Sequence, residues 1–191
     1  MRVDKDLERA VRLWVAEGSE QLPDTALDAA MDRINAEVGA DLIQRLREGH
    51  PDFFEEAVVK LLLKMGYGGA EQRGRRIGGS GDGGVDGVID QDALGLDRIY
   101  VQAKRYADGN TVGRETIQAF VGALHGVGAS RGVFITTSTF SSGARQYAEN
   151  VPSRIILIDS ARLVSLMIKY RVGVQVKQSY DVVELDEDFF E

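Results

Sequence analysis

The chain has 191 residues, of which 43% are hydrophobic and 28% are charged, values that fit one soluble globular domain with an appended segment. It contains no cysteine, which excludes disulfide bonds, thiolate metal sites and a cysteine nucleophile. The sequence has no run of about 18 apolar residues that could cross a membrane. Its start, MRVDKDLERAV, is not typical of a secretory signal, so we expect a cytoplasmic protein without a membrane partner.

The formal net charge of -7 is unevenly distributed along the chain. Residues 1–50 carry 11 acidic and 7 basic side chains, and residues 181–191 carry 6 acidic and no basic ones. The remaining residues, 51–180, carry 13 acidic and 16 basic side chains, a net charge of +3. A mildly basic centre is compatible with a nucleic-acid partner, with modest and salt-dependent non-specific affinity.

In chain order, the first predicted elements are helices. Apolar spacing predicts helices over residues 4–17 and 24–47, and Gly49 and Pro51 separate this segment from the rest. The next helix, over 53–65, has the clearest apolar stripe and ends at Gly66. At about 100° per residue, Glu55 lies beside that stripe and Glu56 lies nearly opposite it. The stripe consists of Phe54, Ala57, Val58, Leu61, Leu62 and Met65.

Strands and helices alternate after residue 80. We predict strands over 84–90, 98–104, 132–137 and 154–159, and helices over 111–127, 141–150 and 160–170. Ile99, Val101 and Ala103 share one strand face and are expected to pack on a helix. The predicted fold is an α/β sandwich with a mixed central sheet flanked by helices and an N-terminal helical segment. We divide it into a helical segment at 1–50, a domain at 51–178 and an acidic tail at 179–191, a short strand or a frayed end.

Polar side chains on the first two strands are candidates for a metal site. Asp86 offers a carboxylate, Gln102 an amide oxygen and Ala103 a backbone carbonyl, and oxygen ligands are what hard divalent cations prefer. Lys104 lies on the same strand face as Gln102, where its ammonium group can orient a water and a phosphate oxygen. An aspartate and a Q-x-K pattern occur on strands of many proteins, so spacing alone leaves a purely structural role open.

Several blocks of the sequence together resemble a known nuclease family. FFEEAVVKLLLKMGYGG, GGSGDGGVDGVI, DRIYVQAKRY, GVFITTSTFSSGARQYAE and IILID occur in that order between Phe53 and Met167. They are similar to the catalytic domain of Mrr-type restriction endonucleases, members of the PD-(D/E)XK nuclease superfamily. The resemblance implies a restriction-endonuclease-like sandwich with a site made of Asp86, Gln102 and Lys104, assisted by Glu55.

The resemblance also implies an activity. That activity is the hydrolysis of double-stranded DNA with Mg²⁺, and Mn²⁺ can replace Mg²⁺. Its role is the restriction of modified, often methylated, foreign DNA. Gln102 replaces the acidic residue of the wider superfamily, so a neutral ligand predicts weak metal binding completed by the DNA phosphate. A DNA-binding module that does not cut, and a nuclease acting in repair or on branched DNA, remain alternatives. A double-strand break needs two cuts, which favours a homodimer through residues 1–50.

Basic and glycine-rich residues surround the proposed site. Arg73, Arg75 and Arg76 flank the loop GGSGDGGVDG at 78–87, and they and Arg105 are candidate phosphate contacts. The six glycines of the loop either bring backbone amides close to a phosphate or form a flexible turn. Thr136, Thr137 and Ser138 end a predicted strand and Ser141 opens the next helix, so this Ser/Thr cluster is predicted first as a helix-capping device. The resemblance places this strand end near the rim of the site, which leaves a DNA contact as the alternative.

Overall fold

The structure is a computed structural model that describes residues 24–69, 74–76, 84–92, 94–179, 181, 183 and 185–191. Side chains are not described for residues 24–26 and for Arg75. The helix predicted over 4–17, Arg73 and the glycine loop up to residue 83 lie outside these ranges.

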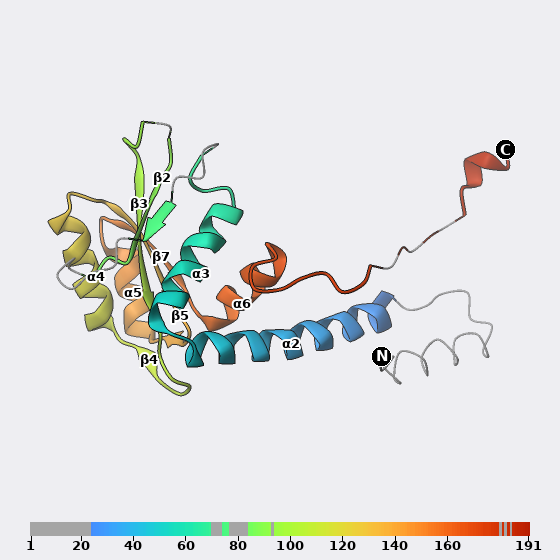
Figure 1. Ribbon diagram of the computed structural model, residues 1–191, viewed down its shortest axis with the longest axis horizontal. Helices are drawn as coiled ribbons and strands as arrows, with labels where there is room; N and C mark the ends of the chain where they lie inside the picture. Colours follow the sequence, from blue (N-terminus) through green and yellow to red (C-terminus); the bar gives the residue numbers. More distant parts are fainter. Residues whose placement is uncertain are drawn as a thin grey trace.

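A mixed five-stranded sheet lies at the centre of the fold, in the order β1-β2-β3-β5-β7 (Figure 1). β1 pairs with β2 and β2 with β3 in antiparallel fashion, whereas β3–β5 and β5–β7 are parallel. This confirms the predicted mixed sheet. The strands are β1 (Gly74–Arg76), β2 (Gly87–Asp90), β3 (Arg98–Lys104), β5 (Arg131–Thr136) and β7 (Arg154–Ile158).

Helices cover both faces of the sheet and enclose two hydrophobic cores. The first core lies under α2 (Asp24–Glu48), α3 (Pro51–Lys64) and α6 (Ser160–Lys169). The second core lies under α4 (Arg114–Gly126) and α5 (Ser142–Asn150). The layers are therefore helix, sheet and helix, as the alternation of predicted elements indicated.

Strand alternation decides which core each residue of β3 joins. Ile99, Val101 and Ala103 pack into the first core, whereas Tyr100 packs into the second, which confirms the predicted faces. The stripe of α3 is buried in the first core as predicted. Leu42 and Leu46 of α2 are buried in the same core, so the end of the N-terminal helical segment packs as part of the main domain.

Two predicted elements, the strand at 84–90 and the helix at 111–127, begin later in the structure than expected. Residues 84–86 precede β2, which begins at Gly87, and residues 111–112 form β4 (Thr111–Val112) rather than the start of α4. β4 pairs in parallel with β6 (Thr139–Phe140), which was not predicted. Val112 is fully buried in the second core. Tertiary packing therefore keeps residues 111–112 extended, although the local sequence pattern predicted a helix there.

Of the predicted Ser/Thr capping cluster, Ser141 caps a helix as expected, whereas Thr136, Thr137 and Ser138 do not. Ser141 is the N-cap of α5, and its Oγ accepts a hydrogen bond from the Ala144 backbone N–H at 3.1 Å. Thr137 is buried, and its Oγ1 accepts from the Tyr106 N–H and donates to the Tyr106 carbonyl, both at 2.9 Å. The cluster therefore ties the end of β5 to the chain that leaves β3.

In the acidic tail, the described residues form no strand. A short 3₁₀ turn, η1 (Glu187–Phe189), lies near the end of the chain. Among the helices that the structure describes, none combines the length and apolar character needed to span a membrane.

Candidate functional site

Asp86 lies directly before β2 and is hydrogen-bonded to Val101 and Ala103 in the second half of β3. Its backbone N–H donates to the Val101 carbonyl at 2.8 Å, and its Oδ2 accepts from the Ala103 N–H at 2.8 Å. Gly87 is the register partner of Val101, so Asp86 faces Gln102 one position beyond the paired stretch. The half-buried carboxylate is therefore fixed against the backbone of the Q-x-K strand, as the sequence predicted for two neighbouring strands.

The carbonyl of Ala103 points to the same side as its N–H. In an extended strand, the N–H and C=O of one residue point toward the same neighbouring strand. Because the Ala103 N–H reaches Asp86, the Ala103 carbonyl also points toward the β2 side. The Asp86 carboxylate and the Ala103 carbonyl oxygen are thus on the same side of β3.

Gln102 is 6% exposed and lies on the opposite strand face from Val101 and Ala103. Gly84 packs directly against its amide: a Cβ atom at residue 84 would lie 2.9 Å from Gln102 Nε2. Gly84 has φ of +90°, a conformation that glycine adopts without strain. The last described residues of the glycine loop therefore leave room for the Gln102 amide.

Lys104 is the last residue of β3 and is exposed to solvent. Its register partner on β5 is Thr136. By strand alternation its side chain extends from the same face as Gln102, two residues along. Asp86, Gln102, Ala103 and Lys104 are thus gathered at one end of the sheet.

Glu55 lies on the inner side of α3, whereas Glu56 is exposed, which confirms the helical-wheel prediction. The Glu55 carboxylate is held by Arg76 of β1, whose Nε donates to Oε2 at 2.5 Å. A second nitrogen of Arg76, Nη2, pairs with Asp52 Oδ1 at 2.6 Å. Arg76 is the register partner of Gly87, so this ion cluster lies beside the start of β2.

The ion cluster shifts the pKa values of two of its members. The hydrogen bond from Arg76 is the largest cause that lowers the pKa of the Asp52 carboxyl below its ordinary value. The same bond, followed by that to Glu55, raises the pKa of Arg76. Arg76 therefore stays charged and is already engaged with two carboxylates.

Arg105 also makes internal contacts. Its Nη1 donates to the carbonyls of Arg47 and Gly49 at the junction of α2 and α3. Arg47 in turn donates from Nη2 to the Thr137 carbonyl at 2.9 Å and pairs with Asp108 at 3.0 Å. These contacts join the end of β3 to α2 and β5 around the exposed Lys104.

Sequence reasoning missed the roles of Arg47, Gly84 and Thr137. Arg47 carried no signal, because its contact with Thr137 joins residues 90 positions apart. β1 also went unpredicted because Gly-Arg-Arg has no apolar alternation. The side chain of Arg75 is not described, so of the four candidate phosphate contacts the structure describes the side chains of Arg76 and Arg105.

The donor set fits a hard divalent cation that receives little negative charge from the protein. Asp86, the Ala103 carbonyl and the Gln102 amide all offer oxygen, the ligand atom that Mg²⁺ prefers. Within the described part of the chain, no group of three or more histidine, cysteine, aspartate or glutamate side chains could hold a metal ion. Of the three donors Asp86, Gln102 and Ala103, Asp86 alone carries a negative charge.

Comparison with known proteins identifies relatives of this chain. The family model for the catalytic domain of Mrr restriction endonucleases matches residues 46–167. Over 169 residues the chain is 48% identical to the type IV methyl-directed restriction enzyme EcoKMrr of Escherichia coli (strain K12), covering 88% of this chain and 54% of that enzyme. The chain thus spans about half the length of this relative.

Two solved restriction endonucleases share the fold. One is MspJI in complex with a 27-mer oligonucleotide, with a TM-score of 0.53 and 23% identity over 73% of this chain and 32% of that one. The other is the DNA modification-dependent restriction endonuclease AspBHI, with a TM-score of 0.57 and 18% identity over 73% of this chain and 36% of that one. At these identities the likeness supports the restriction-endonuclease fold alone.

Proposed function

Because the chain belongs to the Mrr family of restriction endonucleases, we propose that it hydrolyses phosphodiester bonds of double-stranded DNA where β2 begins and β3 ends. The observation that carries the proposal is the Asp86 carboxylate, fixed at 2.8 Å from the Ala103 N–H on the strand that bears Gln102 and Lys104. These residues lie within the segment that the family model matches.

We propose modified DNA as the substrate. EcoKMrr is named methyl-directed, and AspBHI is named modification-dependent. This chain spans 54% of EcoKMrr, so selection of methylated DNA requires its own test.

Asp86, Gln102 and the Ala103 carbonyl would hold the divalent cation, Mg²⁺ or Mn²⁺. When bound, such an ion polarises a phosphodiester and lowers the pKa of a coordinated water. The protein contributes a carboxylate whose orientation is fixed by a backbone hydrogen bond, and an amide for which Gly84 leaves room. Because the carboxylate is prepositioned, less ordering is needed when DNA binds.

Lys104 supplies positive charge where the scissile phosphate would lie. Its ammonium group is exposed at the end of β3 and can donate to a phosphate oxygen or to the attacking water. Glu55 acts from α3, and the contact with Arg76 orients its carboxylate beside the start of β2. Glu55 would accept a hydrogen bond from a water in the site.

The arginines divide between DNA contact and support of the site. Arg76 and Arg105 are committed to contacts within the protein, so we assign them chiefly to holding α3 and β3 in position. Both remain close enough to the site end of the sheet to add to the positive field for phosphates. Arg73 and Arg75 are proposed as direct phosphate contacts.

Plasmid cleavage with Mg²⁺ or Mn²⁺, on methylated and unmethylated DNA, tests the function. Asp86→Asn retains a hydrogen-bond acceptor for the Ala103 N–H but removes the charge, so it should abolish cutting while the protein stays folded. Asp90→Asn, at the other end of β2 and paired with Arg98, is the matched control and should cut. Lys104→Ala should likewise lose cutting, whereas Lys60→Ala, an exposed lysine of α3, should not.

Each outcome distinguishes one part of the proposal. If Asp86→Asn and Lys104→Ala cut as fast as the parent protein, the site assignment is wrong. Binding to DNA without nicking, unchanged by a chelator, would replace the nuclease with a non-catalytic DNA-binding module. Cutting that ignores methylation would keep the nuclease and remove the modified substrate. A homodimer, which we propose for double-strand cleavage, is tested by sedimentation of the same samples.

A further inference from the structure

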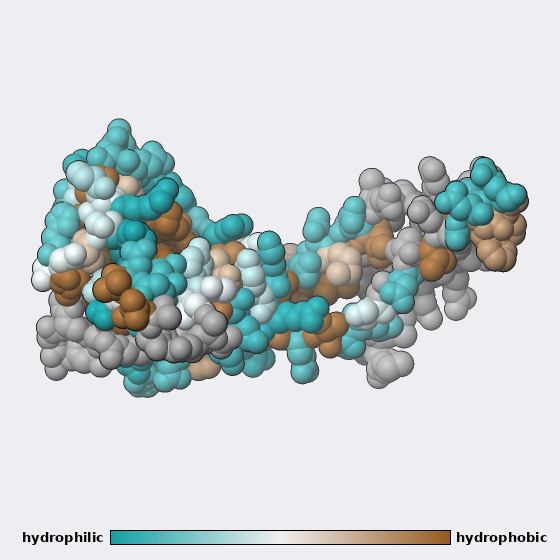
Figure 2. Space-filling model, turned by 90° about the horizontal axis from the view of Figure 1, so that it is seen from above, coloured by the Kyte–Doolittle hydropathy of each residue, from teal (hydrophilic) through white to brown (hydrophobic). Residues whose placement is uncertain are grey.

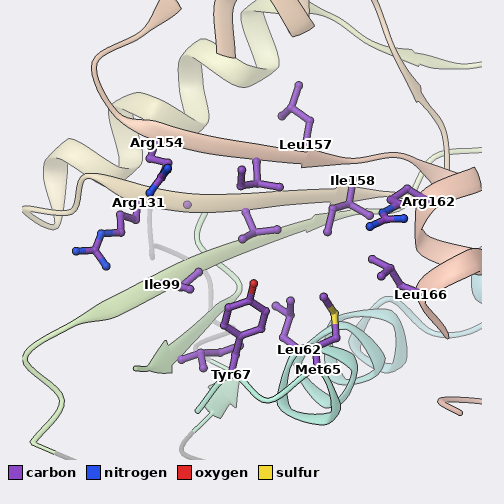
Figure 3. Close-up of a pocket in the computed structure, with 14 residues that line it drawn as sticks. Leu62, Met65, Tyr67, Ile99, Arg131, Arg154, Leu157, Ile158, Arg162 and Leu166 are labelled. Carbon is purple, nitrogen blue, oxygen red and sulfur yellow. The ribbon is translucent and has the colours of Figure 1, made fainter. Parts of the chain in front are cut away.

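A cavity of about 510 Å³ opens on the sheet face that carries α3 and α6 (Figure 3). Its floor is apolar and consists of Ile99, Val133 and Ile156, one residue from each of β3, β5 and β7. Leu62 and Tyr67 from α3 and its following turn form one wall, and Leu166 from α6 forms the other. Ile156 is 50% exposed although it is the central residue of its strand, so the hollow leaves apolar surface in contact with water.

Three arginines surround this apolar floor. Arg131 and Arg154 are register partners at the starts of β5 and β7, and Figure 3 shows them on one side of the cavity, with Arg162 on the other. Arg131 pairs with Asp97 at 2.8 Å. Within the described residues, neither Arg154 nor Arg162 forms an ion pair, and no acidic side chain lines the cavity. The hollow therefore suits a ligand with both apolar groups and negative charges.

The cavity is distinct from the proposed catalytic site. It involves Ile99, near the start of β3, and Arg131, the first residue of β5. Gln102 and Lys104 lie toward the other end of β3, and Glu55 lies near the start of α3 rather than its end. Occupation of the cavity and occupation of the catalytic site therefore involve different residues.

The acidic tail of the chain has the complementary chemistry. Residues 181–191, DVVELDEDFFE, carry six acidic and no basic side chains. Its described apolar residues are largely exposed: Val183 is 87%, Leu185 63%, Phe189 79% and Phe190 67% exposed. Hydrophilic and apolar side chains are both visible at this end of the chain, at the right of Figure 2. We propose that the tail docks in the cavity of its own chain, with Phe189 or Phe190 on the apolar floor and its carboxylates at Arg154 and Arg162.

The tail is long enough to reach. Val174 still packs against the first core, to which Leu62 and Leu166 of the cavity also belong. From Arg162, which lines the cavity, to Lys169, the last residue of α6, the helix rises by about 10 Å over seven residues. The fifteen residues from Val174 to Phe189 span up to about 50 Å when extended. In the structure the tail extends away from the domain (Figure 1), and its length allows it to fold back to the cavity.

An acidic and aromatic segment fits better than a DNA strand. A phosphate backbone would satisfy the arginines but would leave Ile99, Val133 and Ile156 without an apolar partner. Arginine–carboxylate pairs give orientation and specificity, while aromatic burial supplies most of the favourable free energy. The tail offers both kinds of group within eleven residues.

Disulfide trapping tests the docking, because the full chain has no cysteine of its own. Ile156→Cys combined with Phe190→Cys should form an intramolecular disulfide under mild oxidation. The matched control is Val127→Cys with Phe190→Cys, since Val127 is similarly exposed, at 48%, but follows α4 of the opposite layer. We expect the cavity pair to cross-link at least about tenfold faster than the control, as the effective concentration of a docked segment requires.

Charge variants separate docking from chance collision. Adding Arg154→Glu and Arg162→Glu to the cavity pair should slow cross-linking to the control rate, and the neutral pair Arg154→Gln and Arg162→Gln should slow it partly. Thermal unfolding of each variant checks that the fold is retained. Equal rates for the cavity and control pairs would overturn the proposal. Disulfides found only between chains would assign the cavity to the tail of a second copy and would also overturn it.

Discussion

Gly84→Ala should impair cleavage far more than it impairs folding. Gly84 has φ of +90°, where an alanine costs about 1–2 kcal/mol because Cβ approaches the backbone. Its Cβ would also lie 2.9 Å from Gln102 Nε2, a distance that forces the nearly buried amide to move. A shift of roughly 1 Å in a catalytic arrangement can lower the rate by about 100-fold. We therefore expect a loss of about that size in plasmid nicking.

Gly66→Ala is the matched control for this variant. Gly66 has φ of +95°, and nothing lies within 4 Å of the position that its Cβ would occupy. It should thus lose a similar 1–2 kcal/mol of stability, about 2–4 °C in Tm for each kcal/mol in a protein of this size. Its cleavage rate, measured well below the unfolding transition, should stay close to that of the parent protein.

The comparison has a clear refuting result. If Gly84→Ala and Gly66→Ala lose the same stability and cut DNA at the same rate, the position of the Gln102 amide does not matter for catalysis. Gln102 would then be a packing residue rather than a member of the site. Equilibrium unfolding in urea, run on both variants, provides the stability values.

Three further predictions concern stability. Phe134→Ala removes a fully buried ring with two edge-to-face aromatic contacts. In urea titrations it should lower the free energy of unfolding by about 3–5 kcal/mol, and a loss below about 1 kcal/mol would contradict the second core as described. Ser141→Ala removes the N-cap of α5 and should cost about 1 kcal/mol, whereas Ser141→Asp should retain most of it. Arg76 lowers the folded-state pKa of Asp52, so this carboxylate stabilises the fold above its unfolded pKa, and the contribution is lost as the pH falls through the lower folded value. Asp52→Asn should flatten the acid limb of the stability profile below about pH 4, and identical acid limbs would show that the ion pair adds nothing.

Local patterns in the sequence were sufficient to predict which side chains are buried in helices and strands that have one continuous apolar face. The i, i+3, i+4 spacing in α3 depends only on helix geometry, so it predicted both the buried stripe and the inward position of Glu55. Strand alternation likewise assigned Ile99, Val101 and Ala103 to one face of β3 and Tyr100 to the other, because it depends only on the pleat of the strand. Asp86, Gln102 and Lys104 were predicted as a site from strand spacing and oxygen-ligand chemistry, together with the resemblance of the surrounding blocks to Mrr-type endonucleases.

The tertiary structure decided everything that depends on contacts between distant residues. Antiparallel register brings the Asp86 carboxylate to the Ala103 N–H across 17 positions, and Arg47 reaches Thr137 across 90. Arg76 was predicted as a phosphate contact, but folding places it between two carboxylates of α3. The cavity between α3 and α6 likewise exists only because four strands and two helices meet there. The sequence determines local periodicity, because that depends on backbone geometry alone, whereas chain folding determines which charges and surfaces meet.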